Sequence, residues 1–168
     1  MSTQVTVHRM VTTTTTSAFL VNIGYLKTFP GILKIFQIIL GCVAVGITGH
    51  YIHWTSRSEY VVPELFFLLI ATACLITTSL LLFSCLCSIA TSSIMPKTLF
   101  VVLLHGTLSY LLVCSSINLL REVVARNEGY KIYERGYNSK IFSGALGLVN
   151  CALYVLSSIY SVRTFRRG

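Results

Sequence analysis

The chain has 168 residues, of which 54% are hydrophobic and 11% charged, whereas about 25% of the residues of an ordinary soluble domain are charged. A water-soluble fold of this size cannot hide so much apolar surface, so the composition excludes a soluble globular protein and indicates that lipid is the solvent. The 13 Lys and Arg against 5 Glu, with no Asp, give a net charge of +8. This excess suits anionic lipid headgroups, while no basic segment is continuous enough to indicate binding of nucleic acid.

Residues 1–27 are predicted to form a polar leader that is partly disordered. The leader contains the threonine run Thr12–Thr16, and it shows no cleavable signal peptide, because the first strongly apolar stretch begins well inside the chain. We therefore expect the first membrane span to act as its own uncleaved insertion signal.

Four apolar stretches follow, each long enough to cross a bilayer, which takes about 20 mainly apolar residues. The segments that join them are short and leave little chain for a soluble domain. We predict an all-α protein, a four-transmembrane-helix bundle over residues 28–162 with a basic tail at 163–168. The expected spans are Ile32–Trp54, Leu65–Ser88, Leu99–Leu120 and Ile141–Val162.

The distribution of charge gives a weak signal for the orientation of the bundle. Four spans place both termini on one side, where seven Lys and Arg fall against six on the opposite side, which is nearly a tie under the positive-inside rule. The tail cluster of Arg163, Arg166 and Arg167 directly follows a span and favours cytoplasmic termini. Each of these charges is worth about 1 kcal/mol beside an anionic leaflet, so we expect the three arginines to contact anionic lipids.

Polar side chains within the spans are costly in hydrocarbon and mark either function or interhelical contacts. Gln37 is placed to bond Ser84 or Ser88 on the second span. His105 and Asn150 fall at similar depths on the antiparallel third and fourth spans, so we predict that these two side chains meet. A proton relay through His105 is the alternative, and the lack of an intramembrane acid disfavours it.

Two further features concern helix starts and helix packing. Glu64 follows Pro63 at the expected start of the second span, where a carboxylate complements the helix dipole and a proline fits the first turn, so Glu64 is interpreted as a cap. Small residues on the fourth span permit close approach of another backbone, either within one bundle or between protomers. They are Ser143, Gly147, Ser157 and Ser161.

No residue pattern points to a catalytic, cofactor or metal site. His50 and His53 share a helix face and could bind a metal, but with Tyr51 and Trp54 beside them an interfacial aromatic belt is favoured. The chain has no Ser/His/Asp set, no Cys-x-x-Cys and no Gly-rich phosphate loop. We therefore expect no enzymatic activity and no cofactor.

The cysteines divide into two groups. Cys42, Cys74, Cys114 and Cys151 lie within the spans, where they are interpreted as packing residues, and no disulfide is predicted because none of the six lies in an aqueous loop. Cys85 and Cys87 lie at the terminal-side interface. Juxtamembrane cysteines that face the cytosol are sites of reversible palmitoylation, so this pair is a candidate acylation site, with simple packing as the alternative.

The segment Arg121–Lys140 is the longest of the predicted connections. It carries Tyr130, Tyr133 and Tyr137 among charged residues of both signs. Tyrosine is favoured at protein interfaces, which makes these three residues candidates for contact with an opposing membrane or a partner protein. The alternative is that the rings simply lie in the headgroup zone.

Two stretches of the chain resemble a known family. Residues 27–41 read Lys-Thr-Phe-Pro-Gly-Ile-Leu-Lys-Ile-Phe-Gln-Ile-Ile-Leu-Gly, a Pro-Gly step followed by an apolar helix that carries one Lys and one Gln. This stretch resembles the opening of the MARVEL domain. Phe142–Leu156, with small residues followed by Leu-Tyr-Val, is similar to the last helix of that family, and the resemblance extends over about residues 25–162.

The resemblance implies a non-enzymatic tetraspan protein with cytoplasmic termini, at the plasma membrane or on vesicles. It implies action at cholesterol-rich membrane appositions in vesicle traffic or fusion, as for a short-loop insect member linked to myoblast fusion. Partners would be membrane lipids, further copies of the chain or other membrane proteins. The paired loop cysteines of synaptophysin and occludin members are missing, which weakens a structural cell-junction role. An accessory or transport protein is the remaining alternative.

Overall fold

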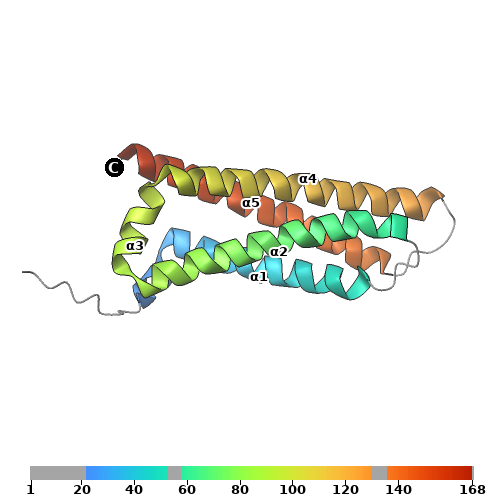
Figure 1. Cartoon of the computed structure of the whole chain (residues 1–168), viewed down its shortest axis with the longest axis horizontal. Helices are drawn as coiled ribbons and strands as arrows, with labels where there is room; N and C mark the ends of the chain where they lie inside the picture. The colour runs from blue at the N-terminus through green and yellow to red at the C-terminus, as the bar shows by residue number, and fades with distance from the viewer. Residues whose placement is uncertain (1–21, 53–57, 130–135, 168) are drawn as a thin grey trace, which may run out of the picture.

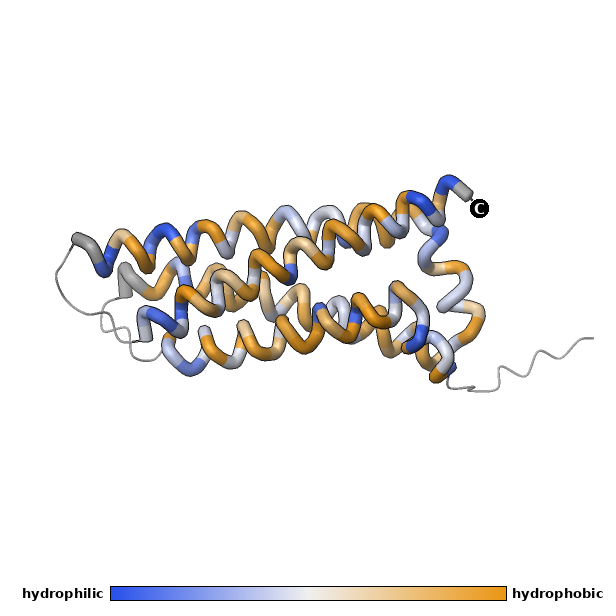
Figure 2. The backbone as a smooth tube through the Cα atoms, turned by 180° about the vertical axis from the view of Figure 1, so that it is seen from behind, coloured by the Kyte–Doolittle hydropathy of each residue, from blue (hydrophilic) through white to orange (hydrophobic). Residues whose placement is uncertain are grey.

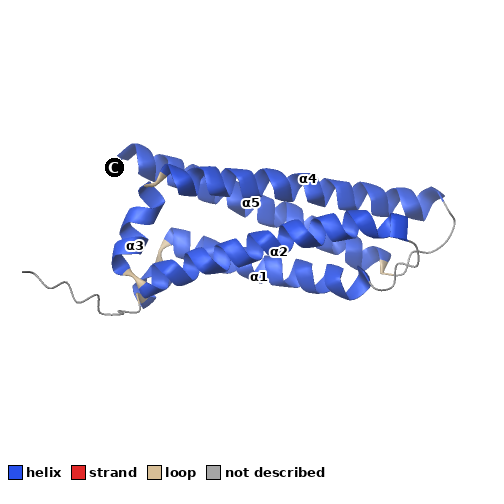
Figure 3. Cartoon of the chain, in the orientation of Figure 1, coloured by secondary structure: helices blue, strands red, loops and turns tan. Residues whose placement is uncertain are grey.

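The computed structural model describes residues 22–52, 58–129 and 136–167, and its regular elements there are helical (Figure 3). Four long apolar helices are present, as the sequence predicts. The elements in chain order are η1 (Ile23–Lys27), α1 (Phe29–Ile52), α2 (Ser58–Cys87), α3 (Ile89–Ile94), η2 (Met95–Lys97), α4 (Leu99–Gly129) and α5 (Tyr137–Arg167).

The long helices pack in a closed ring, because α1 contacts α2, α2 contacts α4, α4 contacts α5 and α5 contacts α1. Each runs antiparallel to the next along the chain (Figure 1). The start of η1, the short helix α3 and the end of α5 lie at one end of the bundle, which we call the terminal end. The opposite end, where α1 ends and α2 begins, is called the far end.

The helices extend beyond the apolar stretches that predict them. α2 begins at Ser58 and includes Pro63, α4 continues to Gly129, and α5 begins at Tyr137. The expected basic tail is mostly helix as well, because α5 continues to Arg167. A 31-residue helix such as α4 is about 46 Å long, which exceeds the hydrocarbon core of about 30 Å, so its last turns lie outside the lipid.

Hydrophobic residues predominate along the four long helices, and hydrophilic residues are more frequent toward the ends of the bundle (Figure 2). Large hydrophobic side chains are exposed on every long helix, among them Phe36, Leu69, Leu103 and Val155. All four long helices have the length and hydropathy of a membrane span. Lipid therefore solvates the outside, as the composition predicts.

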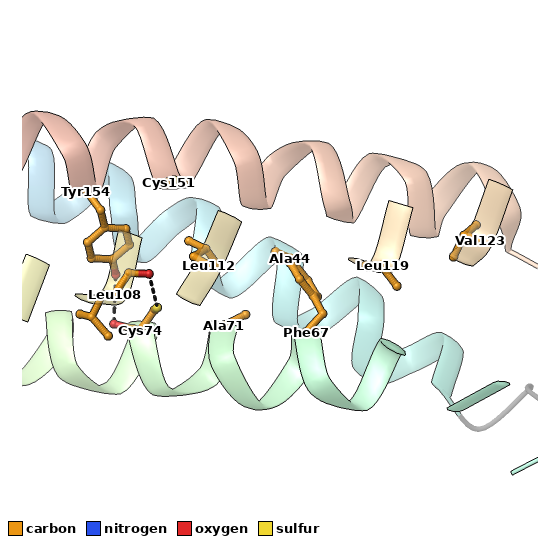
Figure 4. Packing of buried hydrophobic residues seen from close by; sticks show 10 residues of the cluster. All are labelled: Ala44, Phe67, Ala71, Cys74, Leu108, Leu112, Leu119, Val123, Cys151 and Tyr154. Atoms are coloured by element: carbon orange, nitrogen blue, oxygen red, sulfur yellow. Dashed lines mark hydrogen bonds between the residues drawn. The ribbon is translucent and has the colours of Figure 1, made fainter. Parts of the chain in front are cut away.

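The core is a band of apolar side chains along the bundle axis (Figure 4). Phe67, Leu119 and Val123 are completely buried. At the terminal half of this band the Tyr154 hydroxyl donates to the carbonyl oxygen of Cys74 at 3.1 Å and shares a 2.6 Å hydrogen bond with Thr78. The phenol of a fully buried tyrosine is thus satisfied, as burial of a polar group requires.

The small residues of α5 pack inside this bundle. The sequence left open whether they meet another helix of the same bundle or of a second protomer. Ser143, Ser157 and Ser161 are buried, and Ser143 bonds both Thr48 at 2.7 Å and the carbonyl oxygen of Ala44 at 3.0 Å on α1. Close approach of backbones through small residues is the usual means of helix association in lipid.

The start of α1 is a compact turn in which η1 folds back on the helix. The hydroxyl of Thr28 accepts a hydrogen bond from the Gly31 N–H at 3.3 Å and donates to the carbonyl oxygen of Tyr25 at 2.6 Å. A Cβ at position 31 would collide with that carbonyl oxygen. The Pro-Gly step is therefore required by close packing, because only glycine leaves room for η1.

The cysteines inside the spans behave in two ways, and all six cysteines are free thiols. Cys74 and Cys151 are buried, and Cys151 packs against Ser109 on α4 with its sulfur 3.3 Å from the backbone carbonyl oxygen. Cys42 and Cys114 are exposed on the lipid-facing surface. The interpretation as packing residues is confirmed for the first two and wrong for the second two.

Candidate functional site

The terminal half of the bundle holds a group of buried polar side chains between α1 and α5. The side-chain amide of Gln37 donates to the Ser157 hydroxyl at 2.9 Å, and the side-chain amide of Asn150 donates to the backbone carbonyl oxygen of Gln37 at 3.2 Å. Both amides therefore link helices. The predicted partners of Gln37 on α2, Ser84 and Ser88, are wrong, because this face of α1 is turned toward α5.

His105 lies beside this group but does not join it. Its Nδ1 lies 2.7 Å from the carbonyl oxygen of Val101 on the same helix, and its ring lies 6.1 Å from that of Tyr154. Its Nε2 and the Oδ1 of Asn150 are buried and have no hydrogen-bond partner among the residues that the structure describes. The predicted pairing of His105 with Asn150 is therefore wrong, because the Asn150 amide binds α1 instead of α4.

At the far end, three charged side chains from three helices meet in the interior. One carboxylate oxygen of Glu64 on α2 lies 2.6 Å from Arg126 of α4 and 2.9 Å from Lys140 of α5. Glu64 is completely buried, and the side chains of Arg126 and Lys140 are 10% and 2% exposed. We call these residues the far-end ion cluster.

The position of Glu64 contradicts its interpretation as a helix cap. α2 begins at Ser58, so Pro63 and Glu64 lie inside the helix and not in its first turn. The carboxylate binds two cations on other helices instead of the free N–H groups of its own. Sequence reasoning missed this cluster because Arg126 and Lys140 appear in a predicted connection, whereas both belong to the long helices α4 and α5.

Lys34 is a further buried basic residue, outside the far-end ion cluster, whose burial sequence reasoning missed. It is 6% exposed, in the second turn of α1 at the terminal end. It lies three residues before Gln37, and residues at that spacing share a helix face. In a helix whose outside faces lipid, a polar stripe of this kind marks the inward face, which is the signal that could have identified Lys34.

The two candidate acylation residues lie in different surroundings. Cys85 is 1% exposed, with its sulfur 3.9 Å from that of Met95. Cys87, in the last turn of α2, is partly exposed. Acylation requires access of the thiol to an acyl donor, so the structure favours Cys87 over Cys85 as the acceptor.

We expect acyl-exchange labelling of the wild-type protein in cells to depend on Cys87 alone. Cys87→Ser should remove the label, whereas Cys85→Ser, two residues away and buried, should leave it unchanged. The readout is the fraction of protein captured after thioester cleavage. Label that survives Cys87→Ser and disappears only in the double variant would contradict this assignment, and unlabelled wild-type protein would exclude acylation.

The remaining predicted contact residues lie at the two ends. Tyr130 and Tyr133 fall outside the described residues, while Tyr137 begins α5 and packs against the core, so Tyr137 is not a projecting loop residue. Arg163 and Arg166 are exposed in the last turns of α5 at the terminal end. Arg167 ends that helix, and its side chain lies outside the described part.

The histidine pattern at the end of α1 does not form a metal centre in the part of the chain that the structure describes. His50 is exposed and its ring packs edge-on against Tyr51, with centroids 5.0 Å apart. His53 falls outside that part. Among residues 22–52, 58–129 and 136–167, no three His, Cys, Asp or Glu lie close enough together to hold a metal ion.

Comparison with known proteins gives one match. The family model for MARVEL, a membrane-associating domain, matches residues 25–160. The matched range begins in η1 and ends in α5, so it includes all four spans. No curated protein and no solved structure matches the chain.

Proposed function

Because the chain belongs to the MARVEL family of membrane-associating four-span proteins, we propose that it organises membranes where they meet, in vesicle traffic or in membrane fusion such as that of myoblasts. In this proposal the protein has no enzymatic activity and acts on the bilayer and on other membrane proteins. It is an integral multi-pass membrane protein, and we place it at the plasma membrane or on vesicles with both termini in the cytosol.

One observation carries the proposal: each long helix presents large apolar side chains to lipid, while polar side chains of the spans such as Gln37 and His105 lie inside the bundle. The exposed fractions are 55% for Phe36, 61% for Leu69 and 62% for Leu103. In contrast, Gln37 and His105 are 1% exposed. The surface available for action is therefore a lipid-facing one, and the bilayer is what such a surface can influence.

The filled interior supports an organising role over transport. Phe67, Leu112 and Leu119 are at most 1% exposed and lie across the middle and far half of the bundle. They belong to one cluster with the small residues Ala44 and Ala71. A layer of close-packed apolar side chains opposes the passage of a polar solute, because each polar group that enters it loses its hydrogen bonds to water.

The terminal end and the connection between α4 and α5 supply the contacts that this function needs. At the terminal end, the exposed Arg163 and Arg166 suit anionic lipids. In the connection between α4 and α5, Tyr130 and Tyr133 are our candidates for contact with an opposing membrane or partner, because tyrosine is enriched at interfaces. Cholesterol-rich lipid and further copies of the chain complete the set of partners that we propose.

A docking assay tests the contact through Tyr130 and Tyr133. Liposomes that contain the purified full-length protein should dock to target membranes, and Tyr130→Ala with Tyr133→Ala should slow docking about fivefold or more, since truncation of an aromatic anchor costs over about 1 kcal/mol. The matched control is Tyr110→Ala, whose ring is 65% exposed on the lipid-facing surface of α4. Docking that is unchanged by the double variant at equal protein density would contradict the contact.

Imaging in cells tests the wider proposal. A tagged copy should appear on mobile vesicles that arrive at cell contacts, and loss of the protein should reduce docking or fusion there. Static strands along cell contacts would instead indicate a structural junction protein. Solute uptake or current in proteoliposomes would indicate a transport role and would contradict the proposal.

A further inference from the structure

The terminal end contains a pocket with an inner and an outer part. The inner cavity has a volume of about 20 Å³, and its walls include Tyr25, Lys34, Cys85, Ser157 and Ser161. That volume admits one water-sized group. A wider pocket of about 310 Å³ lies against it, and the two share Tyr25, Pro30, Pro96 and Tyr160 as walls. We call the two together the terminal pocket.

Lys34 is a basic residue in the wall of the inner cavity. It is 6% exposed. Among the side chains that the structure describes, none forms an ion pair or a hydrogen bond with Lys34. Lys140, at the far end, is buried to a similar degree but lies 2.9 Å from the carboxylate of Glu64. An anion in the inner cavity would give the Lys34 ammonium a charged partner, as the carboxylate of Glu64 does for Lys140.

The segments that build the terminal end contain no acidic residue. Among the described residues, the terminal end is built from 22–45, 80–105 and 150–167, none of which is Asp or Glu, and residues 1–21 contain no Asp or Glu in their sequence either. The five acids belong to the far half of α2, the far end of α4 and the connection between α4 and α5. They are Glu59, Glu64, Glu122, Glu128 and Glu134. The described segments around Lys34 therefore offer it no carboxylate side chain, and an anionic ligand is the partner that its position suits.

We propose that the terminal pocket binds the phosphate of an anionic phospholipid and that Lys34 is the counter-charge of that phosphate. The terminal end attracts such a lipid, because Lys27 and Lys97 are exposed around the pocket and Arg163 and Arg166 lie on the same end of the bundle. Basic pockets between membrane helices on one leaflet are suited to anionic headgroups. One phosphate oxygen fills the inner cavity, and the rest of the headgroup occupies the wider pocket.

Tyr25 is the second polar group beside the phosphate. Burial raises the pKa of its phenol, and the neighbouring Cys85 raises it further, so the hydroxyl stays protonated at neutral pH and is able to donate a hydrogen bond. The hydroxyls of Ser157 and Ser161 line the same cavity. Hydrogen bonds in which one partner is charged are the stronger ones, so an ammonium and a phenol together favour a phosphate over a neutral headgroup.

The surroundings of the pocket favour a lipid over free phosphate. Large apolar side chains next to the lining residues are exposed, where acyl chains would lie: Ile23, Phe29, Ile94 and Leu99. Phosphate from solution would gain nothing from this apolar rim, whereas the acyl chains of a lipid bury it.

The wider pocket also indicates which headgroup fits. The hydroxyls of Thr28, Ser92, Ser93 and Thr164 line it, and each donates to a carbonyl oxygen of its own segment. The oxygens of Thr28 and Ser92 already accept from the Gly31 N–H and the Asn22 side-chain amide. Those of Ser93 and Thr164 accept from none of the described residues, which leaves them as acceptors for a ligand. A headgroup with several hydroxyl donors, such as inositol, matches them, so phosphatidylinositol is the class of lipid that we expect.

Binding of short-chain lipids to the purified full-length protein tests this inference. Phosphatidylinositol should bind the wild type at least about tenfold more tightly than phosphatidylcholine, and Lys34→Met should remove that difference, as expected for loss of a charged hydrogen bond. The matched control is Lys27→Met, an exposed lysine at the same end, which should change binding less than about twofold. Tyr25→Phe, which keeps the ring in place, should weaken phosphatidylinositol binding about threefold or more.

Three outcomes would overturn the inference. They are equal binding of the two lipids by the wild type, equal losses in Lys34→Met and Lys27→Met, and displacement of the lipid by inorganic phosphate alone, which would identify free phosphate as the ligand. The inference rests on the proposed function only in that both act on lipid. A protein that selects the headgroup but does not dock vesicles would refute the proposed function alone, and a protein that docks vesicles without selecting the headgroup would refute the pocket alone.

Discussion

Replacement of Glu64 with glutamine is expected to lower the free energy of unfolding by about 3–5 kcal/mol, the usual cost of breaking a buried ion pair by removal of one partner. The substitution keeps the shape of the side chain but leaves Arg126 and Lys140, which are 10% and 2% exposed, without the carboxylate that they share. Thermal or denaturant unfolding of the purified protein in one detergent measures the loss, together with the fraction that elutes as a monodisperse species.

Glu122→Gln provides the matched control for this prediction. Glu122 is a partly exposed acid on α4, and its contact with Arg126 is made by its backbone carbonyl oxygen at 3.1 Å, which the substitution leaves in place. We expect a change within about 0.5 kcal/mol, as for surface positions. Equal stability of the Glu64 and Glu122 variants would show that the far-end ion cluster does not hold α2, α4 and α5 together.

The four spanning helices could be predicted from the sequence in number and type, but their ends and the short helices η1, α3 and η2 could not. Apolar length fixes a span because lipid forces every backbone group to bond within the helix. Outside the lipid this constraint no longer applies, and side-chain packing determines where each helix begins and ends. α2 extends back through Pro63 to Ser58, where Glu64 reaches partners on two other helices, and no local pattern within the sequence of α2 reveals those partners.

The polar residues of the interior could be predicted as buried, but their partners could not. Lys34, Gln37, Gly41, Ala44 and Thr48 are buried residues of α1 at a spacing that repeats one helix face. In a lipid-facing helix such a small and polar stripe marks the inside. The rotation of each helix about its axis determines which neighbour the stripe meets, and it turned Gln37 and Asn150 toward each other's helices and away from Ser84 and His105.

Gly147→Ala is expected to destabilise the bundle by about 1–3 kcal/mol, the range for overpacking of a filled core, and Gly147→Val by more. A Cβ at this position would collide with the Ser116 hydroxyl on α4 and would lie 2.7 Å from Cε2 of Phe67 on α2. Phe67 is completely buried, so its ring cannot move aside into lipid. The backbone of α5 therefore needs a residue without a side chain where it meets two helices at once.

Gly46→Ala is the control that separates packing from helix propensity. No atom lies within 4 Å of the place where its Cβ would stand, so this change should keep or raise stability by up to about 1 kcal/mol, the intrinsic gain of alanine over glycine in a helix. Unfolding of both variants in the same detergent gives the comparison. If Gly147→Ala were as stable as Gly46→Ala, α5 would have to stand farther from α2 and α4 than the contacts of Gly147 place it.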